Sequence, residues 1–202
     1  MAAATSEEIL IEDCGQARVV TLNRPKQLNA LTHSMVEQLR QVYEQAECGN
    51  KISLLILKGF GQVFCAGFDV AEMTKAGNCS VFKEMAYTSG ILNHIMGTYT
   101  KPHVALLDGI VMGGGAGISI LGSIRVVTEK TVFSMPETAL GFHPGTGASH
   151  FLSRLPGFLG EYVGLTGCQL NGAEMVACGL ATHFVPSKIS LASISKSPMV
   201  VA

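Results

Sequence analysis

The sequence predicts a single α/β domain in which short strands alternate with helices. Its 202 residues fall near the upper end of the range for one domain. Hydrophobic residues make up 48% of the chain and charged residues only 14%, a balance that excludes a disordered chain. Short apolar runs, typical of buried strands, alternate along the chain with stretches whose apolar residues recur at helical spacing.

The first half of the chain is expected to begin with a hairpin, whose strands are residues 9–13 and 17–23. Thr32 is a suitable N-cap for a helix through Glu47, because apolar residues recur behind it at helical spacing. These apolar positions are Val36, Leu39, Val42 and Tyr43. The remaining elements of this half are a buried strand at 53–57, a glycine-rich loop at 59–69 and a helix at 81–98.

The second half is expected to continue the same alternation. We predict strands at 104–107, 125–128, 132–134 and 181–185, and helices at 116–122, 147–156, 158–166 and 172–178. From Ser190 onward the apolar periodicity is lost. We therefore expect one domain over residues 1–189, followed by a disordered tail over residues 190–202.

Charge and hydropathy narrow the class of protein. The chain has 14 Lys and Arg against 15 Asp and Glu, without a basic stripe, so neither nucleic acid nor an anionic membrane is an expected partner. The longest apolar stretch, residues 104–121, contains Asp108 and several glycines and does not read as a membrane span. The N-terminus lacks the features of a secretory signal. We expect an intracellular, soluble protein of unassigned compartment, whose sparse charge favours self-association.

The cysteines and histidines do not form a recognisable metal site. None of the six cysteines has CxxC spacing, and we interpret them as small buried thiols in a reducing compartment. His143 and His150 lie seven residues apart without an evident third ligand. We expect no metal and no other cofactor.

Two glycine-rich loops, 64–69 and 112–117, each follow a buried strand and are the strongest candidates for chemistry. One backbone N–H from each loop could bind an oxyanion in acyl transfer, although tight packing of two loops would explain the glycines equally well. Glu137 follows a short strand among apolar residues. Burial would raise its pKa and suit it to acid/base catalysis, but a glutamate at a helix start is the other interpretation.

Four ordered motifs resemble the crotonase (enoyl-CoA hydratase/isomerase) superfamily. They are Asn23-Arg-Pro-Lys-Gln-Leu-Asn-Ala-Leu31, Phe64-Cys-Ala-Gly-Phe-Asp69, the segment from Lys101-Pro102 to Gly113-Gly-Gly115, and Met135-Pro-Glu137 with Gly141. Within the superfamily, the motifs over 135–185 are most similar to those of the hydrolases of 3-hydroxyisobutyryl-CoA. The resemblance covers about residues 7–188.

The resemblance implies a superhelix of β-β-α turns and a hydrolysis that belongs to valine degradation. An acyl-CoA thioester would be the substrate, with its carbonyl oxygen bound by the backbone N–H groups of Phe68 and Gly114, and Glu137 would activate or position the attacking water. CoA contacts are implied for Arg24, Lys26, Ala30, Ala66, Gly67 and Asp69. The family continues into C-terminal helices used in assembly, and we expect this chain to be a shortened form that ends before most of them.

The chain departs from the family pattern at several positions. The hydrolase aspartate eight residues after Glu137 is Gly145 here, and the second glutamate of the hydratases falls at Gly117. A further substrate-contacting glutamate aligns poorly and falls near Glu84. His143 could replace the missing aspartate as a base near neutral pH. Two alternatives to hydrolysis therefore stay open, namely hydration or isomerisation of an enoyl-CoA and binding of CoA esters or a partner subunit without turnover.

Overall fold

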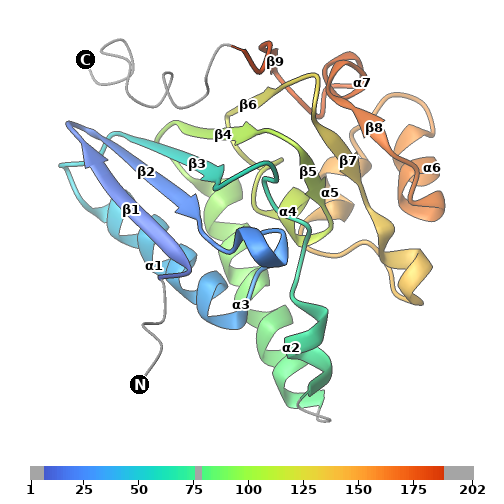
Figure 1. Ribbon diagram of the computed structural model, residues 1–202, viewed down its shortest axis with the longest axis horizontal. Helices are drawn as coiled ribbons and strands as arrows, with labels where there is room; N and C mark the ends of the chain where they lie inside the picture. The colour runs from blue at the N-terminus through green and yellow to red at the C-terminus, as the bar shows by residue number, and fades with distance from the viewer. Residues whose placement is uncertain (1–6, 76–78, 189–202) are drawn as a thin grey trace.

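A computed structural model describes residues 7–75 and 79–188, which form two β-sheets with helices (Figure 1). The larger sheet has six strands in the order β1-β2-β3-β4-β6-β9. Only β1 and β2 pair antiparallel, and every other neighbouring pair is parallel. The strands are β1 (Ile9–Cys14), β2 (Ala17–Leu22), β3 (Leu54–Gly59), β4 (His103–Leu107), β6 (Ile124–Val127) and β9 (His183–Phe184).

The smaller sheet has three strands, β5 (Ile110–Met112), β7 (Val132–Ser134) and β8 (Leu170–Asn171). The chain alternates between the two sheets. β4 and β6 join the larger sheet, and β5 and β7, which follow them in the chain, join the smaller one. Cys65 extends the same pattern, since it bridges to Val111 after β3 has joined the larger sheet. The chain therefore winds as a superhelix in which each turn adds backbone to both sheets.

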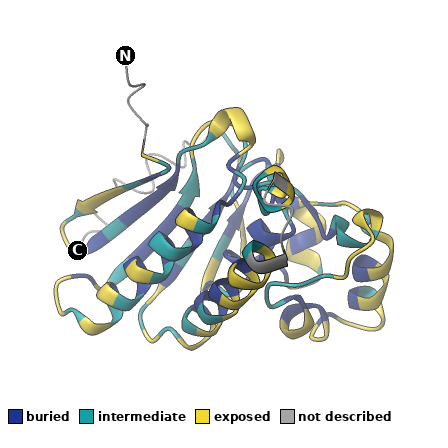
Figure 2. Cartoon of the chain, turned by 90° about the horizontal axis from the view of Figure 1, so that it is seen from below, coloured by how far each residue is buried: buried dark blue, intermediate teal, exposed yellow. Residues whose placement is uncertain are grey.

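Two long helices, α1 (His33–Cys48) and α3 (Cys79–Thr98), pack against each other and cover one face of the larger sheet. The core joins alternate strand residues, such as Leu55 and Leu57, to the apolar face of α1. In Figure 2 the central strands are mostly buried, whereas the helices carry exposed residues on their outer sides. Burial on the order of 2 kcal/mol per large apolar side chain holds these layers together.

The remaining helices are short. They are η1 (Pro25–Gln27), α2 (Val70–Lys75), α4 (Gly114–Gly117), η2 (Pro136–Leu140), α5 (Ala148–Leu152), α6 (Leu159–Thr166) and α7 (Gly172–Ala177). Asn171 and Glu174 form a reciprocal capping box at the start of α7. Apart from α6, which has eight residues, none of these helices is longer than six residues, or about two turns.

Most predicted elements are confirmed, including the Thr32 N-cap, whose hydroxyl accepts a hydrogen bond from the Met35 amide at 3.1 Å. The helix predicted at 116–122 is wrong, because α4 begins at Gly114 and ends at Gly117. Glycines are poor helix formers, and a Cβ at Gly115 would lie 2.5 Å from the Cys65 carbonyl oxygen. The strand predicted at 181–185 is two residues long, and α2, β5 and β8 were not predicted.

Two further expectations concern the C-terminal residues and the absence of a membrane span. The tail expected at residues 190–202 lies outside the described residues. Among the described helices, none has the length and apolar character needed to cross a membrane. The apolar stretch 104–121 instead contributes β4, β5 and α4.

Candidate active site

The first glycine-rich loop is held between two other segments. The Cys65 amide donates to the Ile110 carbonyl at 2.9 Å, and the Met112 amide donates to the Cys65 carbonyl at 3.0 Å. On its other side the loop pairs with Leu31, whose amide donates to the Gly67 carbonyl at 2.8 Å. These bonds fix the loop against the start of the second glycine-rich loop.

The amides of Phe68 and Gly114 lie next to each other where the two loops meet. A Cβ atom on Gly114 would lie 3.3 Å from the Phe68 nitrogen, and a Cβ on Gly67 would lie 3.5 Å from the Gly114 nitrogen. Neither N–H has a backbone acceptor among the described residues. Two adjacent unpaired N–H groups are the arrangement that stabilises an oxyanion. Gly67, with a φ of +111°, adopts backbone that favours glycine at this junction.

The Phe68 ring covers part of this junction. Its Cδ1 and Cε1 atoms would each lie 3.3 Å from a Cβ on Gly114, so the ring packs directly over that residue. The backbone N–H of Phe68 remains available, because a main-chain donor does not depend on its own side chain. The ring therefore restricts the space beside the two amides without removing either of them.

Glu137 lies in η2, directly beside the second loop. Its Oε1 atom would be 3.1 Å from a Cβ on Gly113, the residue that precedes Gly114. Its Oε2 atom is buried without a hydrogen-bond partner among the described residues. Burial raises the pKa of Glu137, and its own backbone amide and His143 offset only part of that shift. A half-buried carboxylate with a raised pKa suits proton transfer.

The two positions where a carboxylate is missing differ in their surroundings. A Cβ on Gly145 would meet no atom within 4 Å, so an aspartate there would enter open space. A Cβ on Gly117 would lie 2.6 Å from the Thr146 hydroxyl and 2.7 Å from the Thr146 carbonyl oxygen. The structure therefore has room for an aspartate side chain at position 145 and no room for a glutamate side chain at position 117.

Arg24 and Lys26 were both predicted to contact CoA, and the structure places them differently. The Arg24 guanidinium donates to the Ala30 carbonyl at 2.6 Å and to Asp69 at 2.9 Å, and it pairs with Glu8 at 3.0 Å. Lys26 is exposed and makes no ion pair in the described part of the chain. Lys26 is thus free to meet an anionic ligand, whereas Arg24 holds three segments together.

Asp69 and the neighbouring loop complete the predicted CoA contacts. Partial burial raises the pKa of Asp69, but hydrogen bonds from the Glu72 amide and from Arg24 outweigh it and hold that pKa below its usual value. Ala66 donates its amide to the Leu28 carbonyl at 3.0 Å, which ties the loop to the turn after η1. Hydrogen bonds thus connect this loop to Arg24 and, through Arg24, to Ala30.

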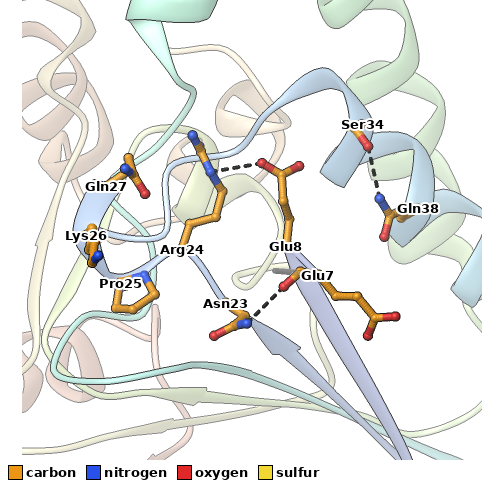
Figure 3. Close-up of a pocket in the computed structure, with 9 residues that line it drawn as sticks. All are labelled: Glu7, Glu8, Asn23, Arg24, Pro25, Lys26, Gln27, Ser34 and Gln38. Atoms are coloured by element: carbon orange, nitrogen blue, oxygen red, sulfur yellow. Dashed lines mark hydrogen bonds and ion pairs between the residues drawn. The ribbon is translucent and has the colours of Figure 1, made fainter. Parts of the chain in front are cut away.

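Two cavities flank Arg24, and neither contains Glu137. The first, of about 700 Å³, is drawn in Figure 3, where Arg24 lies between Glu8 and the turn that carries Lys26 and Gln27. The second, of about 660 Å³, is lined by Arg24, Gln27, Thr32, Asp69, Ala71, Glu72 and Val81. The cavities thus lie beside the predicted CoA contacts, and the catalytic candidates lie at the loop junction.

Several other candidates stand apart from this junction. Glu84 is exposed on α3, with no hydrogen bond or ion pair to the other candidates among the described residues. The described His, Cys, Asp and Glu side chains form no group that could hold a metal. Of the described cysteines only Cys65 is buried, which corrects the expectation for the others, and burial raises the pKa of its thiol to about 12. A buried thiol with a raised pKa is a poor nucleophile.

Asn93 and Thr146 were not among the residues predicted from the sequence. Both side chains contain buried polar atoms without a partner among the described residues, and both lie beside the turn that contains Gly145. An asparagine inside the apolar pattern of the 81–98 helix was the available signal for Asn93. The sequence contained no signal for Thr146, whose φ of +49° is a property of the folded turn.

Comparisons with known proteins agree with this architecture. The family model described as enoyl-CoA hydratase/isomerase matches residues 17–196. The chain is 54% identical over 187 residues to 3-hydroxyisobutyryl-CoA hydrolase 1 of Arabidopsis thaliana, which covers 91% of this chain and 50% of that protein. It is also 46% identical over 181 residues to the small ribosomal subunit protein mS47 of the same plant, covering 88% of this chain and 44% of that protein.

Among solved structures, a carnitinyl-CoA dehydratase from Mycobacterium thermoresistibile superposes with a TM-score of 0.90 at 35% identity. The match covers 97% of this chain and 60% of that one. The crotonase-type α/β fold and the resemblance inferred from the motifs are confirmed. The chain spans about half the length of the curated relatives it matches.

Proposed function

Because the chain belongs to the enoyl-CoA hydratase/isomerase family, we propose that it hydrolyses a short-chain acyl-CoA thioester, most readily 3-hydroxyisobutyryl-CoA. The observation that supports this proposal most strongly is the position of Glu137. Its carboxylate lies beside Gly113, immediately before the unpaired amide of Gly114. A thioester carbonyl bound between the Phe68 and Gly114 amides would therefore have a carboxylate close to its carbon.

The proposed reaction needs only these groups and water. Water attacks the carbonyl carbon while Glu137 accepts a proton from it. The carbonyl oxygen gains charge and is stabilised by the two amides, each worth about 3 kcal/mol in acyl transfer. The carbon–sulfur bond then breaks, and the CoA thiolate takes the proton from Glu137. The raised pKa of Glu137 makes its carboxylate a stronger base toward the attacking water.

The CoA moiety would extend from this junction toward Arg24. Lys26 would pair with its phosphates, and the loop from Ala66 to Asp69 would border the pantetheine. The cavity lined by Arg24, Gln27 and Asp69 supports this direction, because Asp69 belongs to that loop. Arg24 itself would position the loop through Asp69 and Ala30 and would not bind phosphate.

The direct test is release of free CoA from 3-hydroxyisobutyryl-CoA, followed with a thiol reagent. We expect Glu137→Gln to lower the rate by about 10²–10⁴-fold, because the amide cannot accept the proton of water. Glu161→Gln, which changes an exposed carboxylate on α6, is the matched control and should keep the wild-type rate. A Glu137→Gln enzyme as fast as wild type would refute the assigned role.

Two alternatives have distinct signatures in the same assay. A hydratase would consume crotonyl-CoA without releasing CoA, but Gly117 leaves no room for the second carboxylate that this reaction uses in the family. A binding or subunit protein would bind CoA esters without consuming them. The similarity to protein mS47 and the glycine at position 145 favour this second alternative over the hydratase.

A further inference from the structure

Buried polar atoms without hydrogen-bond partners gather beside helix α4 and the turn at residues 145–147. In the described residues, seven buried side-chain N and O atoms lack a hydrogen-bond partner, and four of them belong to Asn93, Glu137 and Thr146. Native proteins pair most of their buried polar atoms, so several orphans in one place need a local explanation.

Contacts to helix α4 place these three residues together. Glu137 Oε1 would be 3.1 Å from a Cβ on Gly113, and Thr146 Oγ1 would be 2.6 Å from a Cβ on Gly117. The Gly117 amide donates to the Gly113 carbonyl at 3.1 Å, so these two glycines are one helical turn apart, or about 5 Å along the helix. Asn93 adjoins Thr146, because its Nδ2 atom would be 3.0 Å from a Cβ on Gly147.

The turn that contains Thr146 is strained. Thr146 is β-branched and has a φ of +49°, a conformation that such residues rarely adopt. Asn93 leaves both its donor and its acceptor unpaired inside the protein. Apolar residues of similar size at these two positions would remove the unpaired atoms, so stability does not account for their presence. Strain and unpaired polar groups that occur together are typical of a binding site.

We propose that Asn93 and Thr146 bind the hydroxyl group on C3 of the acyl chain and so determine specificity for hydroxylated substrates. The inference rests on the proposed function, because it takes the thioester carbonyl to lie beside Glu137. A hydroxyl donates one hydrogen bond and accepts others, which matches the amide of Asn93 and the hydroxyl of Thr146. Thr146 lies about one turn of α4 away from Glu137, because the two residues adjoin Gly117 and Gly113.

The test compares 3-hydroxyisobutyryl-CoA with isobutyryl-CoA, which has the same carbon skeleton without the hydroxyl. For the wild-type protein we expect a higher kcat/KM with the hydroxylated ester. Asn93→Leu and Thr146→Val keep the approximate shape of each side chain and remove its polar atoms. We expect each variant to lower the ratio of the two kcat/KM values about ten-fold.

Thr88→Val is the matched control, because Thr88 is a buried polar residue of the same helix whose hydroxyl instead contacts His33 at 3.3 Å. Its ratio should equal that of wild type. Melting temperatures test folding, and Asn93→Leu should melt no lower than wild type because it loses no hydrogen bond within the described residues. A wild-type protein without preference, or variants that keep the wild-type ratio, would overturn the inference.

A binding measurement separates this inference from the proposed hydrolysis. The dissociation constants of the two esters are compared by calorimetry in wild type and in both variants. If CoA is not released but wild type binds the hydroxylated ester more tightly and the variants lose that preference, the hydroxyl site is supported while hydrolysis is refuted. Equal affinity for both esters in a wild-type protein that releases no CoA would refute both.

Discussion

At the scale of single residues, the site depends on which glycines have space around them. Gly113 and Gly114 bring backbone close to Glu137 and Phe68, and a Cβ at these positions would lie only 3.1 Å and 3.3 Å from them. Gly145 is different, because no atom lies within 4 Å of its Cβ position and its φ lies outside the left-handed region. Nothing in the backbone therefore requires glycine at position 145.

Gly145→Asp should accordingly increase the rate of CoA release. The new carboxylate would supply a charged hydrogen-bond partner for the substrate or water, an interaction worth about 1.5–3 kcal/mol, or roughly ten-fold to a hundred-fold in rate. The measurement is kcat/KM with 3-hydroxyisobutyryl-CoA, beside Gly97→Asp as a control that adds the same charge in open space on α3. An intact Gly145→Asp protein without a gain would show that the missing aspartate does not limit turnover.

The residues of the site divide into those that sequence can predict and those that it cannot. Glu137 and the Phe68–Gly114 pair stand in motifs, where residue type and spacing already indicate chemistry. Asn93 and Thr146 gain their meaning from a turn that brings together residues about fifty positions apart in the chain. Arg24 also stands in a motif, but its role depends on Glu8 and Asp69, which the fold supplies as partners.

At the scale of elements, length decides which strands and helices the sequence predicts. Helix α1 has an N-cap and an apolar face over sixteen residues, so local sequence specifies it. Strands β5 and β8 have three and two residues and exist because both pair with β7. Such pairing depends on residues far apart in the chain, which periodicity does not reveal.

Arg24 links three such elements, the start of β1, the turn after η1 and the first glycine-rich loop. Arg24→Met should lower the free energy of unfolding by about 2–3 kcal/mol, because Glu8, Asp69 and the Ala30 carbonyl would lose their shared partner. Lys26→Met, which removes an exposed cation from the same turn, should change it by less than about 0.5 kcal/mol. Denaturant unfolding measures both, and equal effects would contradict the assigned division of roles.

At the scale of the whole molecule, the superhelix covers one face of its larger sheet well and leaves apolar surface elsewhere. Phe158, Tyr162 and Leu165 are 84%, 57% and 74% exposed and recur at helical spacing along one side of α6. Leu140 of η2, which packs beside α6, is 68% exposed. Neighbouring exposed apolar side chains of this kind favour self-association.

The double variant Tyr162→Lys/Leu165→Glu should therefore weaken self-association of the chain. Each substitution removes a large apolar side chain from the contact, and burial of such a side chain contributes about 1.5–3 kcal/mol, so the dissociation constant should rise by at least about 100-fold. Sedimentation velocity over a concentration series measures the change. Tyr87→Lys, at a 74% exposed position of α3 outside this cluster, is the control and should leave association unchanged. A wild-type chain that stays monomeric at every concentration, or a double variant that associates as strongly as wild type, would contradict this role for the α6 surface.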